Sequence, residues 1–247
     1  LVGRTIEEVP TIQALSHPIA KAVLQRISPQ GGLEVVSLSD VPEGTGMGSS
    51  GAFTVGLLGA VCGFQQLNVL PRFLAQEACG VLMDELRLPE GKQDPYLTAL
   101  GGFQAFHIAS DGGITLEKFS LSKETVAAFE ANTLLFYTGA QRSSHDILRE
   151  QEQKTVAKDQ QILESKHRIK EIGHLIYYAF RQGDLNTFGR LIDEHWRVKK
   201  NVSGKISSER FDEIYERAKR AGALGGKLMG AGGGGFFLFY CEGDAHE

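Results

Sequence analysis

The pattern of apolar and polar residues predicts a mixture of helices and strands in the first half of the chain. Apolar residues recur at helical spacing over 11–27, and an unbroken apolar run over 33–38 is typical of a strand. Farther along, the patterns predict helices over 53–67, 70–86 and 95–100, and then a hairpin of strands over 103–109 and 114–119.

The pattern changes near residue 121, and we place a boundary there between a first domain, 1–121, and a second domain, 122–247. The second domain opens with a short helix over 123–131 and a strand over 134–137. It continues with helical residues 143–200, broken near 181–184, a helix over 207–221 with Ser207 as its N-cap, and strands over 227–229 and 236–240.

The composition is that of an ordinary globular protein. Of 247 residues, 42% are hydrophobic and 23% are charged, and the net charge is −4. This charge favours neither nucleic acid nor an anionic membrane as a partner. No apolar run reaches the length of about 18 residues that a membrane span needs. No signal peptide is visible, so we expect a cytoplasmic protein.

The three cysteines, Cys62, Cys79 and Cys241, are far apart in the sequence and lie among apolar residues. No Cys-x-x-Cys pair is present, and the histidines show no metal-binding spacing. The pattern favours small buried side chains in a reducing compartment over a disulfide framework or a metal site.

The segment 42–52, Pro-Glu-Gly-Thr-Gly-Met-Gly-Ser-Ser-Gly-Ala, lies between a predicted strand and a predicted helix. Free N–H groups at a helix N-terminus can hold an anion, and Gly44, Gly46 and Gly48 let the backbone approach it closely. Ser49 and Ser50 add hydroxyls that can cap the helix or reach a phosphate or metal. Many such loops bind nothing, so the composition alone leaves both interpretations open.

This segment resembles the ATP-binding motif of the GHMP kinases, usually written P-x-x-x-G-L-G-S-S-A-A. Met47 and Gly51 differ from the usual Leu and Ala. The resemblance implies that the ATP-binding residues of this segment are Pro42, Gly44, Gly46, Met47, Gly48, Ser49, Ser50, Gly51 and Ala52.

Asp94 lies in a turn between two predicted helices, where an aspartate is commonly a helix cap. The alternative is a carboxylate that accepts a proton from a substrate hydroxyl. Gly-Lys-Gln-Asp-x-Tyr, followed by Gly-Gly-Phe, resembles the sugar kinases of the family, and the heptose 7-phosphate kinases above all. The resemblance implies that Asp94 is the catalytic base and that Gly91 and Gln93 contact the substrate.

The segment 225–236, Gly-Gly-Lys-Leu-Met-Gly-Ala-Gly-Gly-Gly-Gly-Phe, resembles the family's third motif. So many glycines between two strands indicate either a flexible hairpin tip or a close backbone approach. The resemblance implies that Gly232 and Gly233 help to bind ATP and that Gly230 contacts the substrate.

Two further segments resemble the heptose kinases. In 136–144, Arg142 ends a predicted strand beside two serines, and the resemblance implies that it holds a substrate phosphate. A solvated surface arginine is the alternative. In 195–200, His-Trp-Arg-Val-Lys-Lys, Lys199 and Lys200 are weaker candidates, and Trp196 is more typical of a core.

The chain departs from the family in two places. The family's first motif lies in a segment of some tens of residues that Leu1 to Val9 cannot supply, so we expect the chain to be N-terminally incomplete. The family also has a Mg²⁺-binding Glu where this chain has Leu82. We expect Ser50 to contact Mg²⁺, and either Asp84 or water to take the place of the missing Glu, while impaired catalysis is the alternative.

The resemblance implies an α+β fold of two domains, the first like ribosomal protein S5 domain 2 and the second ferredoxin-like. It implies a sugar kinase that uses ATP and Mg²⁺ to phosphorylate the anomeric hydroxyl of a heptose 7-phosphate. The expected partner is a small sugar phosphate, with no nucleic acid and no membrane, and a homodimer is left open. The alternatives are a fucokinase, galactokinase or mevalonate kinase, or a non-catalytic nucleotide-binding homologue.

Overall fold

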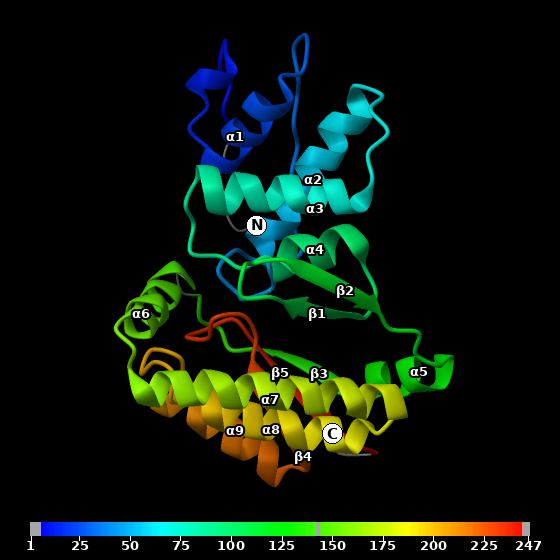
Figure 1. Cartoon of the computed structure of the whole chain (residues 1–247), viewed down its shortest axis with the longest axis vertical. Coiled ribbons are helices and arrows are strands. Elements are labelled where there is room, and N and C mark those ends of the chain that lie inside the picture. The colour runs from blue at the N-terminus through cyan, green and yellow to red at the C-terminus, as the bar shows by residue number, and fades with distance from the viewer. Residues whose placement is uncertain (1–5, 142–143, 244–247) are drawn as a thin grey trace. The chain divides into compact units, whose positions relative to one another are not determined.

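The computed structural model describes residues 6–141 and 144–243, which form two compact units (Figure 1). The first unit comprises residues up to 42 together with 48–106. The second comprises 43–47 together with 107 onward. The domain boundary near residue 121 stays a prediction, because compact units and family domains need not divide a chain at the same residue.

The first unit is a group of helices packed around one central helix. After a short 3₁₀ turn, Ile12–Ala14, come α1 (Pro18–Ile27), α2 (Ser49–Phe64), α3 (Pro71–Cys79), the π-helical segment η2 (Gly80–Glu85) and α4 (Gln93–Leu100). α2 contacts α1, α3 and α4. Leu58 of α2 is fully buried and belongs to a core with Val23 of α1 and Val81 of η2. The helices predicted over 53–67, 70–86 and 95–100 are therefore confirmed.

Two predictions for this unit are wrong. The helix predicted over 11–27 begins only at Pro18, because proline favours the first helical turn and excludes the preceding residue from the helix. Residues 33–38 form no strand, and Val36 and Leu38 are 71% and 91% exposed. A strand needs a hydrogen-bonded neighbour, and no described strand pairs with this segment.

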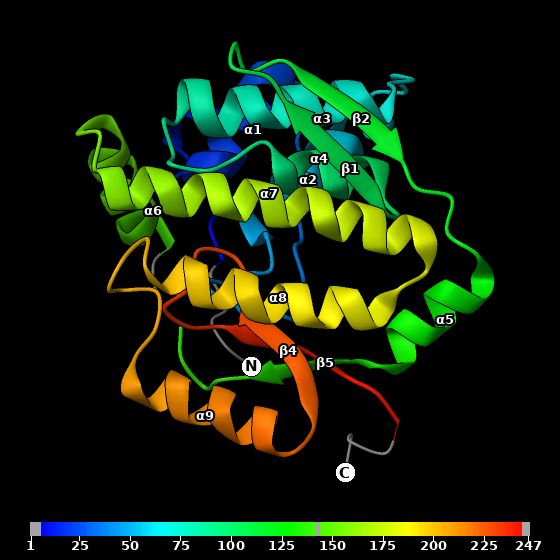
Figure 2. The same ribbon diagram turned by 60° about the horizontal axis from the view of Figure 1, so that its bottom comes forward.

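The second unit contains a three-stranded antiparallel sheet of order β3-β5-β4. Its strands are β3 (Thr133–Tyr137), β4 (Ala223–Leu228) and β5 (Phe236–Cys241). Its helices are α5 (Lys123–Ala131), α6 (Ser144–Val156), α7 (Gln160–Gln182), α8 (Leu185–Lys200) and α9 (Glu209–Arg220). Figure 2 shows β4 running between α8 and α9, and both helices contact it. Fully buried Trp196 and Phe237 lie at the centre of its core.

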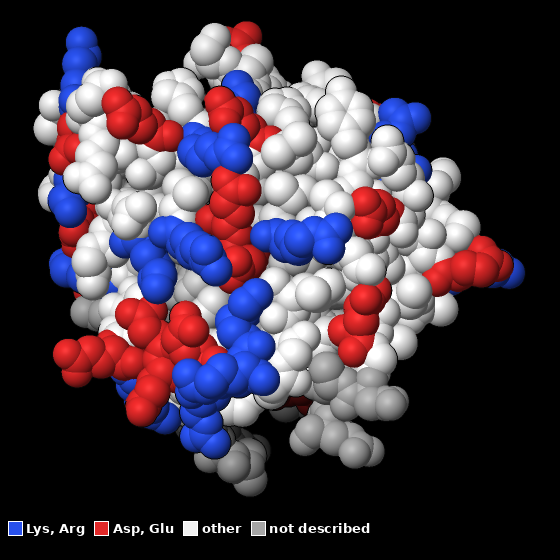
Figure 3. Space-filling view, turned by 90° about the horizontal axis from the view of Figure 1, so that it is seen from below, with Lys and Arg blue, Asp and Glu red and all other residues white. Residues whose placement is uncertain are grey.

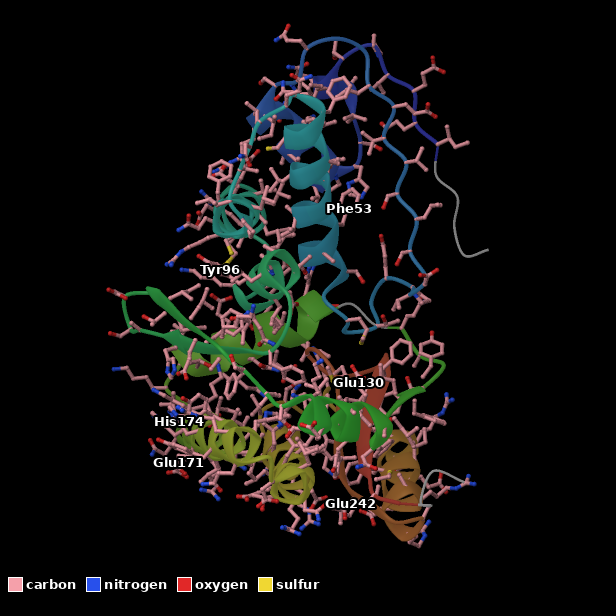
Figure 4. All side chains as sticks on the ribbon, turned by 90° about the vertical axis from the view of Figure 1, so that its right-hand side faces the viewer. Phe53, Tyr96, Glu130, Glu171, His174 and Glu242 are labelled. Atoms are coloured by element: carbon pink, nitrogen blue, oxygen red, sulfur yellow. The ribbon has the colours of Figure 1, made fainter. Side chains whose placement is uncertain are left out.

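The predicted hairpin is confirmed as β1 (Gln104–Ile108) and β2 (Ile114–Lys118). Tyr96 on α4, labelled in Figure 4, is buried and meets Phe106 of β1 edge to face at 6.4 Å between ring centroids. This contact fixes one side of α4, the helix that carries Asp94.

Three details of the second unit differ from the prediction, and the first is that β4 begins at Ala223 rather than at Lys227. The helical stretch 143–200 has an additional break, since α6 ends at Val156 and α7 begins after its N-cap, Asp159. The N-cap of α9 is Ser208 rather than Ser207. Ser208 Oγ accepts from the Phe211 N–H at 3.4 Å, while Ser207 Oγ donates to Asp212 at 2.9 Å. The serine with extended backbone next to the helix is the one placed to cap it.

The three cysteines are free and buried, which confirms the prediction that they are small buried side chains. Among the described residues, no helix is both long and apolar enough to cross a membrane. On the face shown in Figure 3, acidic and basic side chains lie next to one another, and no broad area of this face is basic alone.

Candidate active site

The N-terminus of α2 presents backbone donors that nothing in the described part of the chain uses. Its N-cap, Gly48, has a left-handed backbone (φ 71°) and provides no side-chain cap. The N–H groups of Ser49, Ser50 and Gly51 lie in the first turn of α2, where the helix supplies no carbonyl oxygen to accept them. They have no partner among the described residues. This end of α2 can therefore receive an anion.

Asp94 is held against this helix end within the first unit. A β-carbon on Gly48 would lie 3.0 Å from Asp94 Cγ and 3.2 Å from Oδ2, and one on Gly51 would lie 3.0 Å from Asp94 Cβ. Glycine at both positions lets the carboxylate approach the α2 N-terminus. Asp94 lies in the first turn of α4 and does not cap it, since that helix has no side-chain cap.

Asp94 is exposed to solvent on part of its surface, yet the protein packed around the carboxyl raises its pKa. The negative charge of Glu90 raises this pKa further. A carboxylate with a raised pKa accepts a proton more readily than an ordinary aspartate.

In the second unit, the first part of the 42–52 segment packs against the third motif. A β-carbon on Gly46 would lie 2.7 Å from the Met229 carbonyl oxygen, and one on Gly230 would lie 2.6 Å from Gly46 Cα. A β-carbon on Gly235 would lie 1.9 Å from the carbonyl oxygen of Thr45, which is fully buried. Two glycine-rich segments far apart in the sequence thus touch backbone to backbone, which excludes the flexible hairpin tip.

Hydrogen bonds fix one side of the third motif and leave the other side free. The Gly233 N–H donates to Ile206 O and the Gly235 N–H donates to Ala140 O, each at 2.8 Å. The N–H groups of Gly230, Ala231 and Gly232 have no acceptor among the described residues. Gly232 therefore retains a donor for a ligand, whereas the donor of Gly233 holds the loop in place.

For the remaining predicted site residues, the structure gives their exposure or backbone conformation. Gly91 and Gln93 are exposed at the start of α4, whereas Pro42 is partly buried and Gly44 has a positive φ of 71°. Met47 is 37% exposed. Ala52 is exposed in the first turn of α2. Arg142 lies outside the described residues, so its predicted role stays untested.

The described residues contain no group of three or more His, Cys, Asp or Glu side chains that could hold a metal ion. Leu82 is 1% exposed and belongs to the apolar core, so it supplies no ligand. Asp84 is exposed on η2, and Ser50 places a hydroxyl in the first turn of α2. The Ser50 hydroxyl, at the anion-receiving end of α2, fits a Mg²⁺ ion that arrives bound to phosphates and keeps several waters, whereas the Mg²⁺ role of Asp84 stays a prediction.

Comparison with known proteins identifies the family. Residues 14–102 match the GHMP kinases N terminal domain, and residues 176–247 match the GHMP kinases C terminal domain. The two matches together cover more than half of the chain. The chain belongs to the GHMP kinase family.

This GHMP kinase chain is 30% identical over 204 residues to the D-glycero-alpha-D-manno-heptose 7-phosphate kinase of Campylobacter jejuni, a match covering 83% of this chain and 60% of that protein. It is 28% identical over 231 residues to the galactokinase of Pyrococcus furiosus, covering 83% and 63%. A D-glycero-D-manno-heptose 1-phosphate kinase structure from Bacteroides thetaiotaomicron matches with a TM-score of 0.66 and 24% identity, covering 91% and 62%. That identity supports the fold alone.

The chain therefore has the two-domain GHMP kinase fold of mixed helices and strands, which confirms the predicted family and fold class. It spans about three fifths of the length of these relatives.

Sequence reasoning treated Lys199 as a weaker candidate and did not consider Lys227, which lies inside the third motif. Lys199 Nζ donates to the Gly230 carbonyl oxygen, and Lys227 lies on β4 just before the glycines. The sequence feature that could have indicated Lys227 is its position inside a glycine-rich, otherwise apolar strand, where an unpaired charge is costly.

Proposed function

We propose that this chain catalyses transfer of the γ-phosphoryl group of ATP to the anomeric hydroxyl of a heptose 7-phosphate. In this reaction the hydroxyl oxygen bonds to the γ-phosphorus and its proton passes to Asp94. The bond between the γ-phosphorus and the bridging oxygen breaks, and ADP leaves. Mg²⁺ would accompany ATP and neutralise the charge of its phosphates, and Ser50 would be the residue that contacts the ion.

The observation that carries this proposal is the position of Asp94 against the uncapped N-terminus of α2. Phosphoryl transfer needs an anion-binding region and a proton acceptor close together. Glycines 48 and 51 bring these two elements together within one unit. A carboxylate beside a phosphate site would otherwise be unfavourable, so a catalytic role accounts for its placement.

The choice of heptose 7-phosphate rests on the relative from C. jejuni, whose name gives that substrate. The similar match to a galactokinase favours a second candidate, phosphorylation of a neutral hexose. Both candidates use the same site and differ only in what contacts the sugar.

A non-catalytic nucleotide-binding protein is a further candidate. It is favoured by Leu82, which occupies the position of the family's Mg²⁺-binding Glu and is buried in the core. Asp84 would have to supply the missing carboxylate from the exposed side of η2.

The test is ADP release by the full chain with Mg-ATP and, in separate reactions, heptose 7-phosphate, fucose, galactose or mevalonate. Turnover confined to heptose 7-phosphate, and abolished by Asp94→Asn, supports the proposal. Turnover with another acceptor retains the kinase and rejects the heptose. ATP binding without turnover on any acceptor favours the non-catalytic candidate.

A further inference from the structure

Gly48 and Gly51 lie against different parts of Asp94. A β-carbon on Gly48 would meet the carboxyl end of the side chain, with Cγ at 3.0 Å and Oδ2 at 3.2 Å. A β-carbon on Gly51 would instead lie 3.0 Å from Asp94 Cβ and 3.1 Å from both the N and the Cδ of Pro95. The carboxyl atoms move when the side chain changes rotamer, whereas the second set of atoms is fixed to the backbone of α4.

The two glycines also differ in backbone conformation. Gly48 has a positive φ of 71°, a conformation that favours glycine whatever lies nearby. Gly51 is a helical residue of α2, and a helical conformation is open to every residue with a β-carbon except proline. The close contact with α4, rather than the backbone conformation, is therefore what a side chain at position 51 would disturb.

Two buried residues hold α4 in place next to Asp94. Pro95 is buried in the first turn of α4, where a proline is tolerated, and its ring restricts the backbone of the residue before it. Tyr96, labelled in Figure 4, is buried and meets Phe106 of β1 edge to face. A displacement of Pro95 by α2 is therefore passed on to Asp94, the adjacent residue.

A methyl group at position 51 would leave the backbone donors of α2 intact. The Gly51 N–H is one of three in the first turn of α2 that have no partner among the described residues, and alanine has the same N–H. A change from glycine to alanine therefore separates two properties of the site. The donor for a phosphate is kept, and only the position of the carboxylate changes.

We propose that Gly51 and Pro95 are positioning residues, which set the distance between the Asp94 carboxylate and the N-terminus of α2. The inference rests on the proposed function, in which Asp94 accepts the proton of the acceptor hydroxyl while this helix end receives the phosphates. The rate of such a transfer depends on the separation of the two groups, and a misplacement of about 1 Å can lower it about 10²-fold.

A methyl group at position 51 displaces α4 by a few tenths of an ångström, because its contacts at 3.0–3.1 Å are closer than ordinary van der Waals contact. We expect Gly51→Ala to lower kcat by about tenfold and to change the affinity for ATP by less than about twofold. Pro95→Ala replaces the ring carbon on the nitrogen by a hydrogen. Added to Gly51→Ala, it should recover at least about threefold of the lost kcat, since the methyl group gains space.

The experiment compares the unmodified full chain with Gly51→Ala, Gly56→Ala and the double variant of Gly51→Ala with Pro95→Ala. Gly56→Ala adds a methyl group to the same helix where nothing lies within 4 Å, so it controls for the change in helix propensity. Assays with Mg-ATP and heptose 7-phosphate give kcat and KM, and calorimetric titration with ATP alone gives its Kd. Thermal melts check that each variant is folded at the assay temperature. Crystal structures of the unmodified chain and of Gly51→Ala give the distance between Asp94 Cβ and the Cα of residue 51.

We expect this distance to be longer in Gly51→Ala by a few tenths of an ångström, with kcat lowered and the Kd for ATP retained. An equal fall of kcat in Gly56→Ala, an equal loss of kcat and of ATP affinity in Gly51→Ala, or no recovery in the double variant overturns the inference. An unchanged distance overturns it as well. If the unmodified chain turns over no acceptor, the proposed function fails, and the measured distance still decides whether Gly51 and Pro95 position Asp94.

Discussion

Gly51 and Pro95 are in direct contact across two helices of the first unit. A β-carbon on Gly51 would lie 3.1 Å from Pro95 Cδ and equally close to Pro95 N. Gly51 is where the related ATP-binding motif usually has Ala, so the proline ring uses the space that an alanine methyl would fill. The contact also sets the position of the neighbouring Asp94.

We expect Gly51→Ala to be less stable than Gly56→Ala, its matched control on the same helix. A β-carbon on Gly56 meets nothing within 4 Å, so that variant gains about 1 kcal/mol of helix propensity. Gly51→Ala gains the same helix propensity but loses about 1–3 kcal/mol of stability, because its methyl group overpacks against Pro95. Chemical denaturation measures both, and adding Pro95→Ala should restore much of the loss. Equal stabilisation by the two alanines would contradict the contact.

We expect Asp94→Asn to lower kcat by about 10²–10⁴-fold without lowering thermal stability. The folded-state pKa of Asp94 is raised, so above that pKa the charged form costs stability, and a neutral amide removes the cost. In the unmodified chain, kcat should fall as the pH drops through this raised pKa. Turnover assays across pH and thermal melts check both effects, and a variant that retains turnover would rule out Asp94 as the base.

We expect Gly235→Ala to destabilise the chain by about 2–5 kcal/mol, since it combines overpacking with a strained backbone. Its β-carbon would overlap the Thr45 carbonyl oxygen, and its φ is 90°. Gly204→Ala, whose β-carbon meets nothing within 4 Å, should change stability by less than about 0.5 kcal/mol. Denaturant titration compares them, and similar values for the two variants would mean that the glycine-rich segments are not packed together.

We expect the ligand-free chain to gain stability as the pH rises from about 7 toward 9.0, the ordinary thiol value, above which the buried cysteines act in the opposite sense. Lys199 and Lys227 have lowered pKa values when folded, so the unfolded chain binds more protons in this range, and stability then increases with pH. Thermal melts at several pH values should show a smaller slope for Lys227→Met than for the unmodified chain. Lys170→Met, which removes an exposed lysine of α7, should keep the original slope, and identical slopes for all three proteins would count against the lowered pKa values.

Local elements were predictable where a residue pattern and its caps act over a few residues. The helix over Lys123–Ala131 was predicted with its observed bounds, because Ser122 caps it and the apolar spacing is helical. The failure over 33–38 has the opposite cause. An apolar run favours an extended chain, but only a neighbouring strand makes it a β-strand, and that neighbour is not encoded locally.

The sequence by itself determined the family, the two glycine-rich motifs and Asp94 as the candidate base, because these depend on residue types at fixed spacing. Only the tertiary structure decided that Gly46 touches Gly230, that Asp94 lies against Gly48, and that Lys199 of α8 lies close enough to Lys227 of β4 for their charges to interact. These relationships join segments far apart in the chain. They are set by the packing of α2 on α4, of α8 on β4 and of the two glycine-rich loops on each other, which no local pattern specifies.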